Sequence, residues 1–228
     1  MNKITTVFID VDNTLLDFGK SATKAIQQAF FKYKLIYKDE YFEIFNETND
    51  ILWRSLEKGL ITLDKLHEIR WVTIFEQIGI ENVDGVAFDA DFVEISGQIG
   101  IPMDGALEIL QYLSEKYTVC VASNSTYNRQ FYRLSDCKMM NYIDFLFTSE
   151  HINALKPSTE FFDACFKEVG NLQKNQVIMI GDSLTADIAG GKNYGIATCW
   201  YNHTKIENFD ENIADFVVNN LIDIKNFL

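Results

Sequence analysis

The chain has 228 residues, which is enough for one or two domains. Its composition, with 47% hydrophobic and 23% charged residues, is that of a globular protein with a substantial core. The net charge of -13 argues against binding to nucleic-acid polymers, because such binding depends on clustered lysine and arginine. A small phosphorylated ligand remains possible, since a bound Mg²⁺ and one lysine can reverse the field inside a cleft.

The four cysteines are widely spaced and form no C-x-x-C pair. This spacing is typical of reduced cysteines that pack in the interior of a cytosolic protein. No apolar run reaches the length of a membrane span, and Asp10 and Asp12 interrupt the N-terminal run, which argues against a signal peptide. We therefore expect a cytoplasmic protein with no membrane partner. The sequence carries no marker of oligomeric state.

The apolar run 7–9 predicts a buried strand that ends in two carboxylates, Asp10 and Asp12. Two residues apart on an extended chain, they are expected to project the same way, and a cation between them would relieve their repulsion. Thr14 adds a hydroxyl, and the turn at Asn13 is expected to leave backbone N–H groups pointing outward. This strand end therefore predicts a cation site beside an anion site, as phosphoryl transfer requires.

A long stretch with helical spacing follows the first strand. Apolar residues recur at this spacing from Ala22 to Tyr33, with Ser21 as the expected N-cap. The periodicity continues from about Tyr41 to Ile78 with one glycine break, after which Thr62 is typical of a helix start. No strand is expected here, so residues 17–96 are predicted to form an inserted helical domain.

From Gly100 onward, strand-like and helical segments alternate. Strands are expected at 118–122, 145–148, 177–180, 197–200 and 216–218, and helices at 106–116, 127–139, 159–169 and 185–194. Such alternation indicates a parallel sheet covered on both faces. We predict an α/β fold in which residues 1–16 and 97–228 form a Rossmann-like, doubly wound core and residues 17–96 form an α-helical cap.

Polar residues follow the predicted strands, at the edge where such sheets bind ligands. They are Ser123, Asn124, Lys156, Asp182, Ser183 and Asp187. Each has an ordinary structural explanation, as a helix cap, a solvated lysine or a first-turn acid. The Asp10 segment, likewise, has the composition of a simple turn. Their occurrence together, and in this order, favours a functional site.

In order, these residues resemble the four motifs of the haloacid dehalogenase-like hydrolase superfamily. The matching positions are Asp10-x-Asp12-x-Thr14, Ser123, Lys156-Pro157, and Gly181-Asp182-Ser183 with Asp187. The resemblance covers essentially the whole chain, and a helical cap between the first two motifs is similar to the C1-cap arrangement. An acid at the position of Asp12 is the pattern of phosphatases and phosphomutases rather than dehalogenases.

The resemblance implies a role for each motif residue. Asp10 would be the nucleophile that forms an aspartyl-phosphate, and Asp12 the general acid and base. Mg²⁺ would be held by an Asp10 oxygen, the Asp12 carbonyl and Asp182. The phosphoryl group would be bound by Thr14, Ser123, Asn124 and Lys156. Metal-bound water would be oriented by Ser183 and Asp187.

Further stretches look like the bacterial pyrimidine 5′-nucleotidases of this superfamily. They are Asp12 to Phe18, Asn49 to Arg54, Arg70-Trp71 and Cys199 to Asn202. Ser125 and Trp71 depart from that pattern, in which Gly and Phe are commoner. The expected function is Mg²⁺-dependent hydrolysis of a small phosphorylated metabolite, a nucleoside 5′-monophosphate. Arg54 and Arg70 are candidate substrate contacts, since a guanidinium suits an anionic ligand, whereas Trp71 is expected to pack inside the cap.

Three alternatives remain open from the sequence. A sugar phosphate phosphatase or phosphomutase would carry the same core motifs. A phospho-accepting signalling module also combines acids, a hydroxyl and a lysine on a doubly wound sheet, but it lacks a cap of this length. A binding protein without turnover is disfavoured by the intact motif set.

Overall fold

The computed structural model describes residues 4–228, which divide into two compact units. One unit contains the described residues up to Phe18 together with Gly100–Leu228, and the other is Gly19–Ile99. The expected boundaries at residues 16/17 and 96/97 lie close to these limits, while residues 1–3 of the expected core lie outside the described residues. The second unit thus interrupts the first in sequence, soon after its first strand.

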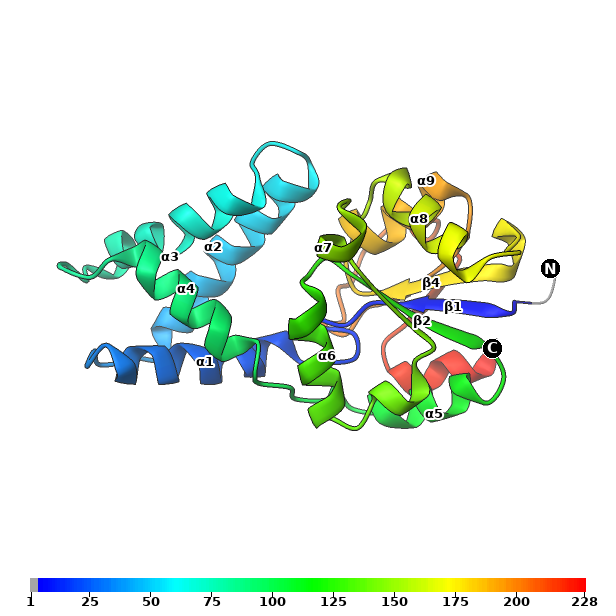
Figure 1. Cartoon of the computed structure of the whole chain (residues 1–228), viewed down its shortest axis with the longest axis horizontal. Coiled ribbons are helices and arrows are strands. Elements are labelled where there is room, and N and C mark those ends of the chain that lie inside the picture. Colours follow the sequence, from blue (N-terminus) through cyan, green and yellow to red (C-terminus); the bar gives the residue numbers. More distant parts are fainter. Residues whose placement is uncertain (1–3) are drawn as a thin grey trace. The chain divides into compact units, whose positions relative to one another are not determined.

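The first unit is built on a parallel six-stranded sheet in the order β3-β2-β1-β4-β5-β6 (Figure 1). The strands are β1 (Thr6–Ile9), β2 (Thr118–Ser123), β3 (Phe145–Thr148), β4 (Val177–Gly181), β5 (Ala197–Tyr201) and β6 (Phe216–Val218). β1 lies between β2 and β4, where the strand order reverses, and α/β sheets bind their ligands at such a point. The predicted Rossmann-like core is confirmed.

Helices cover both faces of this sheet. They are α5 (Ala106–Ser114), α6 (Tyr127–Asp136), α7 (Ser149–Ile152), α8 (Thr159–Val169) and α9 (Ala189–Tyr194), with short turns η1 (Met140–Tyr142), η2 (Lys174–Gln176), η3 (Leu184–Ile188) and η4 (Leu221–Asn226). Val7 and Ile9 of β1 pack in one cluster with Ile109 of α5, whereas Phe8 packs in another with Phe161 of α8. Figure 1 shows α5 on one side of the strands and α8 and α9 on the other. Both faces of β1 are therefore buried, as its unbroken apolar run predicts.

The expected helix at 185–194 is two elements, the π-helical turn η3 followed by α9. Ser183 is the N-cap of η3, and its Oγ accepts a hydrogen bond from the Ala186 N–H at 3.0 Å. The carboxylate of Asp187 turns back to accept from the Ser183 N–H at 3.0 Å. Widened turns of this kind often occur at functional sites. Here the turn carries Asp187 back toward the end of β4.

The second unit is helical. Its helices are α1 (Phe18–Lys32), α2 (Glu40–Glu57), α3 (Leu63–Ile78) and α4 (Gly85–Ser96). The first residue of α1, Phe18, still belongs to the first unit. Thr62 caps α3, as predicted, by accepting a hydrogen bond from the Lys65 N–H at 3.2 Å. Ser21 was predicted to cap α1, but this prediction is wrong because the helix begins at Phe18. Ser21 is buried beside Ala22, where its small side chain suits the packed face.

Aromatic side chains form the interior of the second unit. Trp71 is fully buried at its centre, with its ring centroid 4.6 Å from that of Phe88 and 5.6 Å from that of Phe45. Close ring pairs of this kind stabilise a core beyond the area that they bury. The expectation that Trp71 packs inside the helical domain is confirmed.

The four cysteines are free thiols, and Cys120, Cys165 and Cys199 are buried. Burial raises the pKa of the Cys199 thiol to about 12, so it stays protonated at neutral pH.

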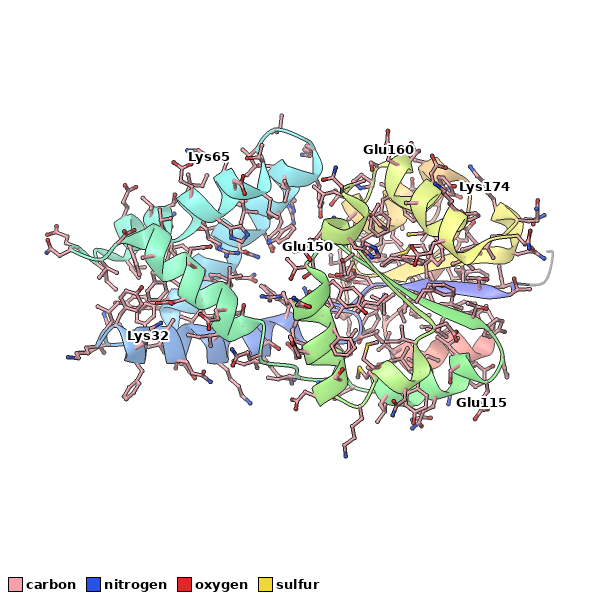
Figure 2. The ribbon with its side chains drawn as sticks, viewed as in Figure 1. Lys32, Lys65, Glu115, Glu150, Glu160 and Lys174 are labelled. Carbon is pink, nitrogen blue, oxygen red and sulfur yellow. The ribbon has the colours of Figure 1, made fainter. Side chains whose placement is uncertain are left out.

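Among residues 4–228, no helix combines the length and the apolar character that a membrane span needs. Charged side chains such as Glu160 and Lys174 extend from the outside of the first unit (Figure 2).

Candidate active site

The predicted site residues of the first unit follow three adjacent strands. Asp10 directly follows β1, Ser123 ends β2, and Asp182 directly follows β4. The Asp10 N–H donates to the Ile180 carbonyl at 2.9 Å, so the β1–β4 ladder continues through Asp10. Because the three strands are parallel neighbours, these residues meet at one edge of the sheet.

Lys156 joins two carboxylates of this cluster. Its Nζ lies 2.7 Å from Oδ1 of Asp10 and 2.6 Å from Oδ1 of Asp187, and its side chain is 2% exposed. Burial alone would lower the pKa of Lys156, but the charges of Asp10 and Asp187 outweigh it and raise the pKa above its usual value. The ammonium therefore stays charged and partly neutralises two buried acids.

Asn124 holds the backbone of Lys156 with both ends of its side-chain amide. Its Nδ2 donates to the Lys156 carbonyl at 2.9 Å, and its Oδ1 accepts from the Lys156 N–H at 2.8 Å. The sequence predicts a phosphoryl contact for Asn124. In the structure its side chain fixes the segment that presents Lys156, a pairing across 32 residues, and the phosphoryl contact stays a prediction.

Asp10, Asp182 and Asp187 place one carboxylate oxygen each within 4.8 Å of one another. Burial raises the pKa of Asp10 to about 7, and the charges of Asp187 and Asp12 act in the same direction while Lys156 opposes them. Burial, followed by the charges of Asp10 and Asp187, also raises the pKa of Asp182 well above its usual value. Crowded carboxylates that resist joint ionisation, with hard oxygen donors, fit the requirements of Mg²⁺.

The three aspartates of this cluster differ in how many contacts their carboxylate oxygens already make within the protein. Asp187 is fully buried, with Oδ1 on Lys156 and Oδ2 accepting from the Ser183 N–H. The Asp182 side chain is 20% exposed, and the Asp182 carbonyl accepts a hydrogen bond from Nε1 of Trp200 at 2.9 Å. The donor set thus fits a cation held by Asp10 and Asp182, with Asp187 behind them fixing Lys156.

Asp12 has partners that sequence reasoning missed. Gln130 Nε2 donates to its Oδ2 at 2.9 Å, and Nη2 of Arg133 lies 2.8 Å from its Oδ1 in an ion pair. Burial would raise the pKa of Asp12, but the charges of Arg133 and Arg129 outweigh it and lower the pKa to about 2. Asp10 and Asp12, expected on one side of the strand, therefore pair with different elements. The sequence feature that could have indicated these partners is the spacing of Gln130 and Arg133, two polar residues three apart on the buried face of α6.

The turn after Asp12 closes on itself. The Asn13 N–H donates to the Leu16 carbonyl at 2.7 Å and the Thr14 N–H to the Val11 carbonyl at 3.2 Å, with Asn13 in the left-handed region at φ 59°. The prediction that this turn leaves its N–H groups free is wrong for these two residues, because the tight turn uses them internally. Thr14 Oγ1 is buried and has no hydrogen-bond partner among the described residues, which leaves it available to a ligand oxygen.

The two arginines proposed as substrate contacts differ in environment. Arg70 is 3% exposed, and its guanidinium donates to Asp89 at 2.8 Å and to Asn49 at 3.0 Å within the helical unit. These contacts commit it to the interior of that unit. Arg54 on α2 is exposed, so of these two arginines it is the one whose guanidinium faces solvent.

A comparison with protein families finds a match to haloacid dehalogenase-like hydrolases over residues 4–195. The chain is 32% identical over 203 residues to the pyrimidine 5′-nucleotidase PynA of Streptococcus pneumoniae, covering 89% of this chain and 85% of that protein. It is 30% identical over 196 residues to the pyrimidine 5′-nucleotidase YjjG of Escherichia coli, covering 86% of this chain and 85% of that protein.

Among solved structures, the chain is similar to the HAD-hydrolase YfnB of Bacillus subtilis, whose crystal structure is described as bound to magnesium and as revealing interdomain movement. The TM-score is 0.93 at 27% identity, and the match covers 100% of this chain and 99% of that one. The L-2-haloacid dehalogenase of Xanthobacter autotrophicus, at 17% identity and a TM-score of 0.73, shares the fold alone.

Proposed function

We infer the function from one premise: this chain belongs to the haloacid dehalogenase-like hydrolases. We propose that it is a Mg²⁺-dependent phosphatase that hydrolyses a small phosphomonoester through an aspartyl-phosphate on Asp10. One observation carries this proposal. The Asp10 carboxylate stands at the end of β1 against a buried lysine, with two further acids within reach of one cation.

Asp10 is the proposed nucleophile. Its Oδ1 is held by Lys156 at 2.7 Å, which leaves the second carboxylate oxygen as the attacking atom. That oxygen bonds to phosphorus as the bond from phosphorus to the leaving oxygen breaks. Lys156 and the hydroxyls of Ser123 and Thr14 are proposed to bind the phosphoryl oxygens as charge moves onto them.

Asp12 is the proposed general acid and base. Because the pKa of Asp12 is about 2 in the free protein, it must first take up a proton, which it passes to the leaving oxygen. It then takes a proton from the water that attacks the aspartyl-phosphate. The carboxylate of Asp10 is regenerated and inorganic phosphate is released, so the sum is hydrolysis of a phosphomonoester. Mg²⁺, held by Asp10, the Asp12 carbonyl and Asp182, would supply charge neutralisation for the anionic phosphoryl group.

A nucleoside 5′-monophosphate is the proposed substrate class. The support is similarity along most of the chain to two proteins described as pyrimidine 5′-nucleotidases. Arg54 stays a proposed substrate contact because its guanidinium is exposed, whereas the buried pairing of Arg70 favours a structural role. We place the reaction in the cytoplasm, in keeping with four free cysteines.

The test is phosphate release with Mg²⁺ from a panel of nucleoside monophosphates and sugar phosphates. Asp10→Asn is run beside the wild type, because an amide cannot act as the nucleophile. Release from nucleotides alone, lost in the variant, is the expected result. Release from sugar phosphates alone would retain the mechanism and overturn the substrate class. Undiminished turnover by Asp10→Asn would overturn the mechanism.

A further inference from the structure

We propose that Gln130 and Arg133 of α6 are positioning residues that aim the Asp12 carboxylate at the water in the second half of the reaction. This inference rests on the proposed phosphatase function. It assigns a task to two residues that lie outside the four sequence motifs. Loss of either is expected to slow hydrolysis of the aspartyl-phosphate rather than its formation.

The amide of Gln130 links Asp12 to the phosphate-binding strand end. Its Nε2 donates to Asp12 Oδ2 at 2.9 Å and to Ser123 Oγ at 2.9 Å. One nitrogen therefore sets the spacing between the proposed base and a proposed phosphoryl ligand. Because one acceptor lies on the loop after β1 and the other is the last residue of β2, a change at either position is transmitted to the other through Gln130.

Arg133 fixes which way that amide points. Its Nη1 donates to Gln130 Oε1 at 3.0 Å, which leaves Nε2 to face Asp12 and Ser123. A second nitrogen, Nη2, lies 2.8 Å from Asp12 Oδ1. The planar guanidinium thus touches both members of the Gln130–Asp12 pair, a geometry that a lysine ammonium does not reproduce.

Anchoring α6 to the core does not require the buried polar contacts of Gln130 and Arg133. Gln130 and Arg133 are both fully buried, and burying an arginine is expensive unless it is paired. The apolar Leu134 already packs α6 into the core, and the Tyr127 N–H at its start donates to Glu150 (labelled in Figure 2) at 2.9 Å. The polar pair is therefore best explained by what it holds, which is the side chain of Asp12.

The donors suit one half of the reaction in particular. Asp12 Oδ2 accepts a hydrogen bond from Gln130 and Asp12 Oδ1 lies 2.8 Å from Arg133 Nη2, so both ends of the carboxylate are held in one orientation toward the attacking water. The Asp12 side chain is still 29% exposed, so lone pairs remain open to an approaching water. In this step the water oxygen bonds to phosphorus, the bond from phosphorus to Asp10 breaks, and the proton passes to Asp12.

The test is burst kinetics with p-nitrophenyl phosphate, whose leaving group departs without a proton donor. Gln130→Met keeps the side-chain length and removes the donor, and is expected to lower kcat roughly 10²-fold, within the range for general acid–base catalysis. Release of about one p-nitrophenol per enzyme should precede this slow turnover, because the phospho-enzyme accumulates. Arg133→Lys should be intermediate between Arg133→Met and wild type.

A double-mutant cycle and a control make the result specific. In an Asp12→Asn background, Gln130→Met should cause a much smaller loss than in the wild type, because only its bond to Ser123 remains to be lost and residues that act as a unit are non-additive. Gln111→Met is the matched control, since the Gln111 side chain on α5 donates to the Tyr142 hydroxyl at 3.1 Å rather than to Asp12, and kcat should be unchanged.

The outcomes separate this inference from the proposed function. If the wild type releases phosphate from no phosphomonoester, the proposed function fails and the inference fails with it. If the wild type is active but Gln130→Met keeps its kcat, or loses it without a burst, only the inference is overturned. Should Arg133→Met fail to fold, the Gln130→Met result alone decides.

Discussion

Replacing Gly181 by alanine should destabilise the first unit, because Asp187 occupies the space that a Cβ would take. An ideal Cβ at this position lies 2.1 Å from Oδ2 and 2.3 Å from Cγ of Asp187. The carboxylate cannot easily move away, since Oδ1 is 2.6 Å from Lys156 Nζ and Oδ2 accepts from the Ser183 N–H. The added methyl must therefore push Asp187 away from Lys156.

The expected magnitude follows from two effects. Overpacking a filled interior costs about 1–3 kcal/mol. Breaking a buried ion pair costs about 3–5 kcal/mol when one charge is left without its partner. Because Asp187 is displaced rather than removed, and Lys156 keeps Asp10, we expect Gly181→Ala to lower the free energy of unfolding by about 3–5 kcal/mol in total.

Denaturant unfolding of the wild type and variants measures this loss. Gly170→Ala is the matched control, because Gly170 has φ 71° and nothing within 4 Å of the added Cβ. With ψ at 152°, Gly170 lies in a backbone region that essentially only glycine adopts, so this variant should cost about 1–3 kcal/mol of backbone strain without a clash. The cost of Gly181→Ala should fall sharply in an Asp187→Ala background. A Gly181→Ala variant no less stable than Gly170→Ala would refute the reasoning.

Three further outcomes are expected. Arg70→Met should lower the free energy of unfolding by about 3–5 kcal/mol, because Asp89 loses the buried arginine that pairs with it. Arg54→Ala should leave the free energy of unfolding unchanged and raise KM. An Arg70→Met variant with unchanged stability and a raised KM would reverse these roles. Asn124→Leu should lower kcat roughly 10²-fold by loosening the Lys156 segment, and a wild-type rate would exclude that role. Metal-free protein should lose stability from about pH 4 to about pH 7, because burial raises the pKa of Asp10 to about 7 and the folded state keeps a proton that the unfolded state releases. Mg²⁺ replaces that proton, so it should raise Tm more at about pH 8 than at about pH 5, and equal rises would contradict the assignment.

Local patterns in the sequence determined the architecture and the position of the site. Unbroken apolar runs alternating with helical periods indicate a covered parallel sheet, and the structure has that sheet. Parallel strands place their carboxyl ends at one edge, so Asp10, Ser123 and Asp182 could be assigned to one site without coordinates. This reasoning works because it needs only the type and direction of each strand.

Only the tertiary structure decided which side chains pair. Asp12 and Gln130 are 118 residues apart, and no local period links them. The sequence did not indicate that the Asn124 side chain holds the Lys156 backbone or that Asp89 pairs with Arg70. Periodicity shows that a helix has a buried face, but the partner of a polar group on that face is set by how the helix docks on the sheet or on other helices. The sequence by itself therefore placed the acids that we propose to react, whereas the docking of α6 on the sheet determined that Gln130 and Arg133 contact Asp12.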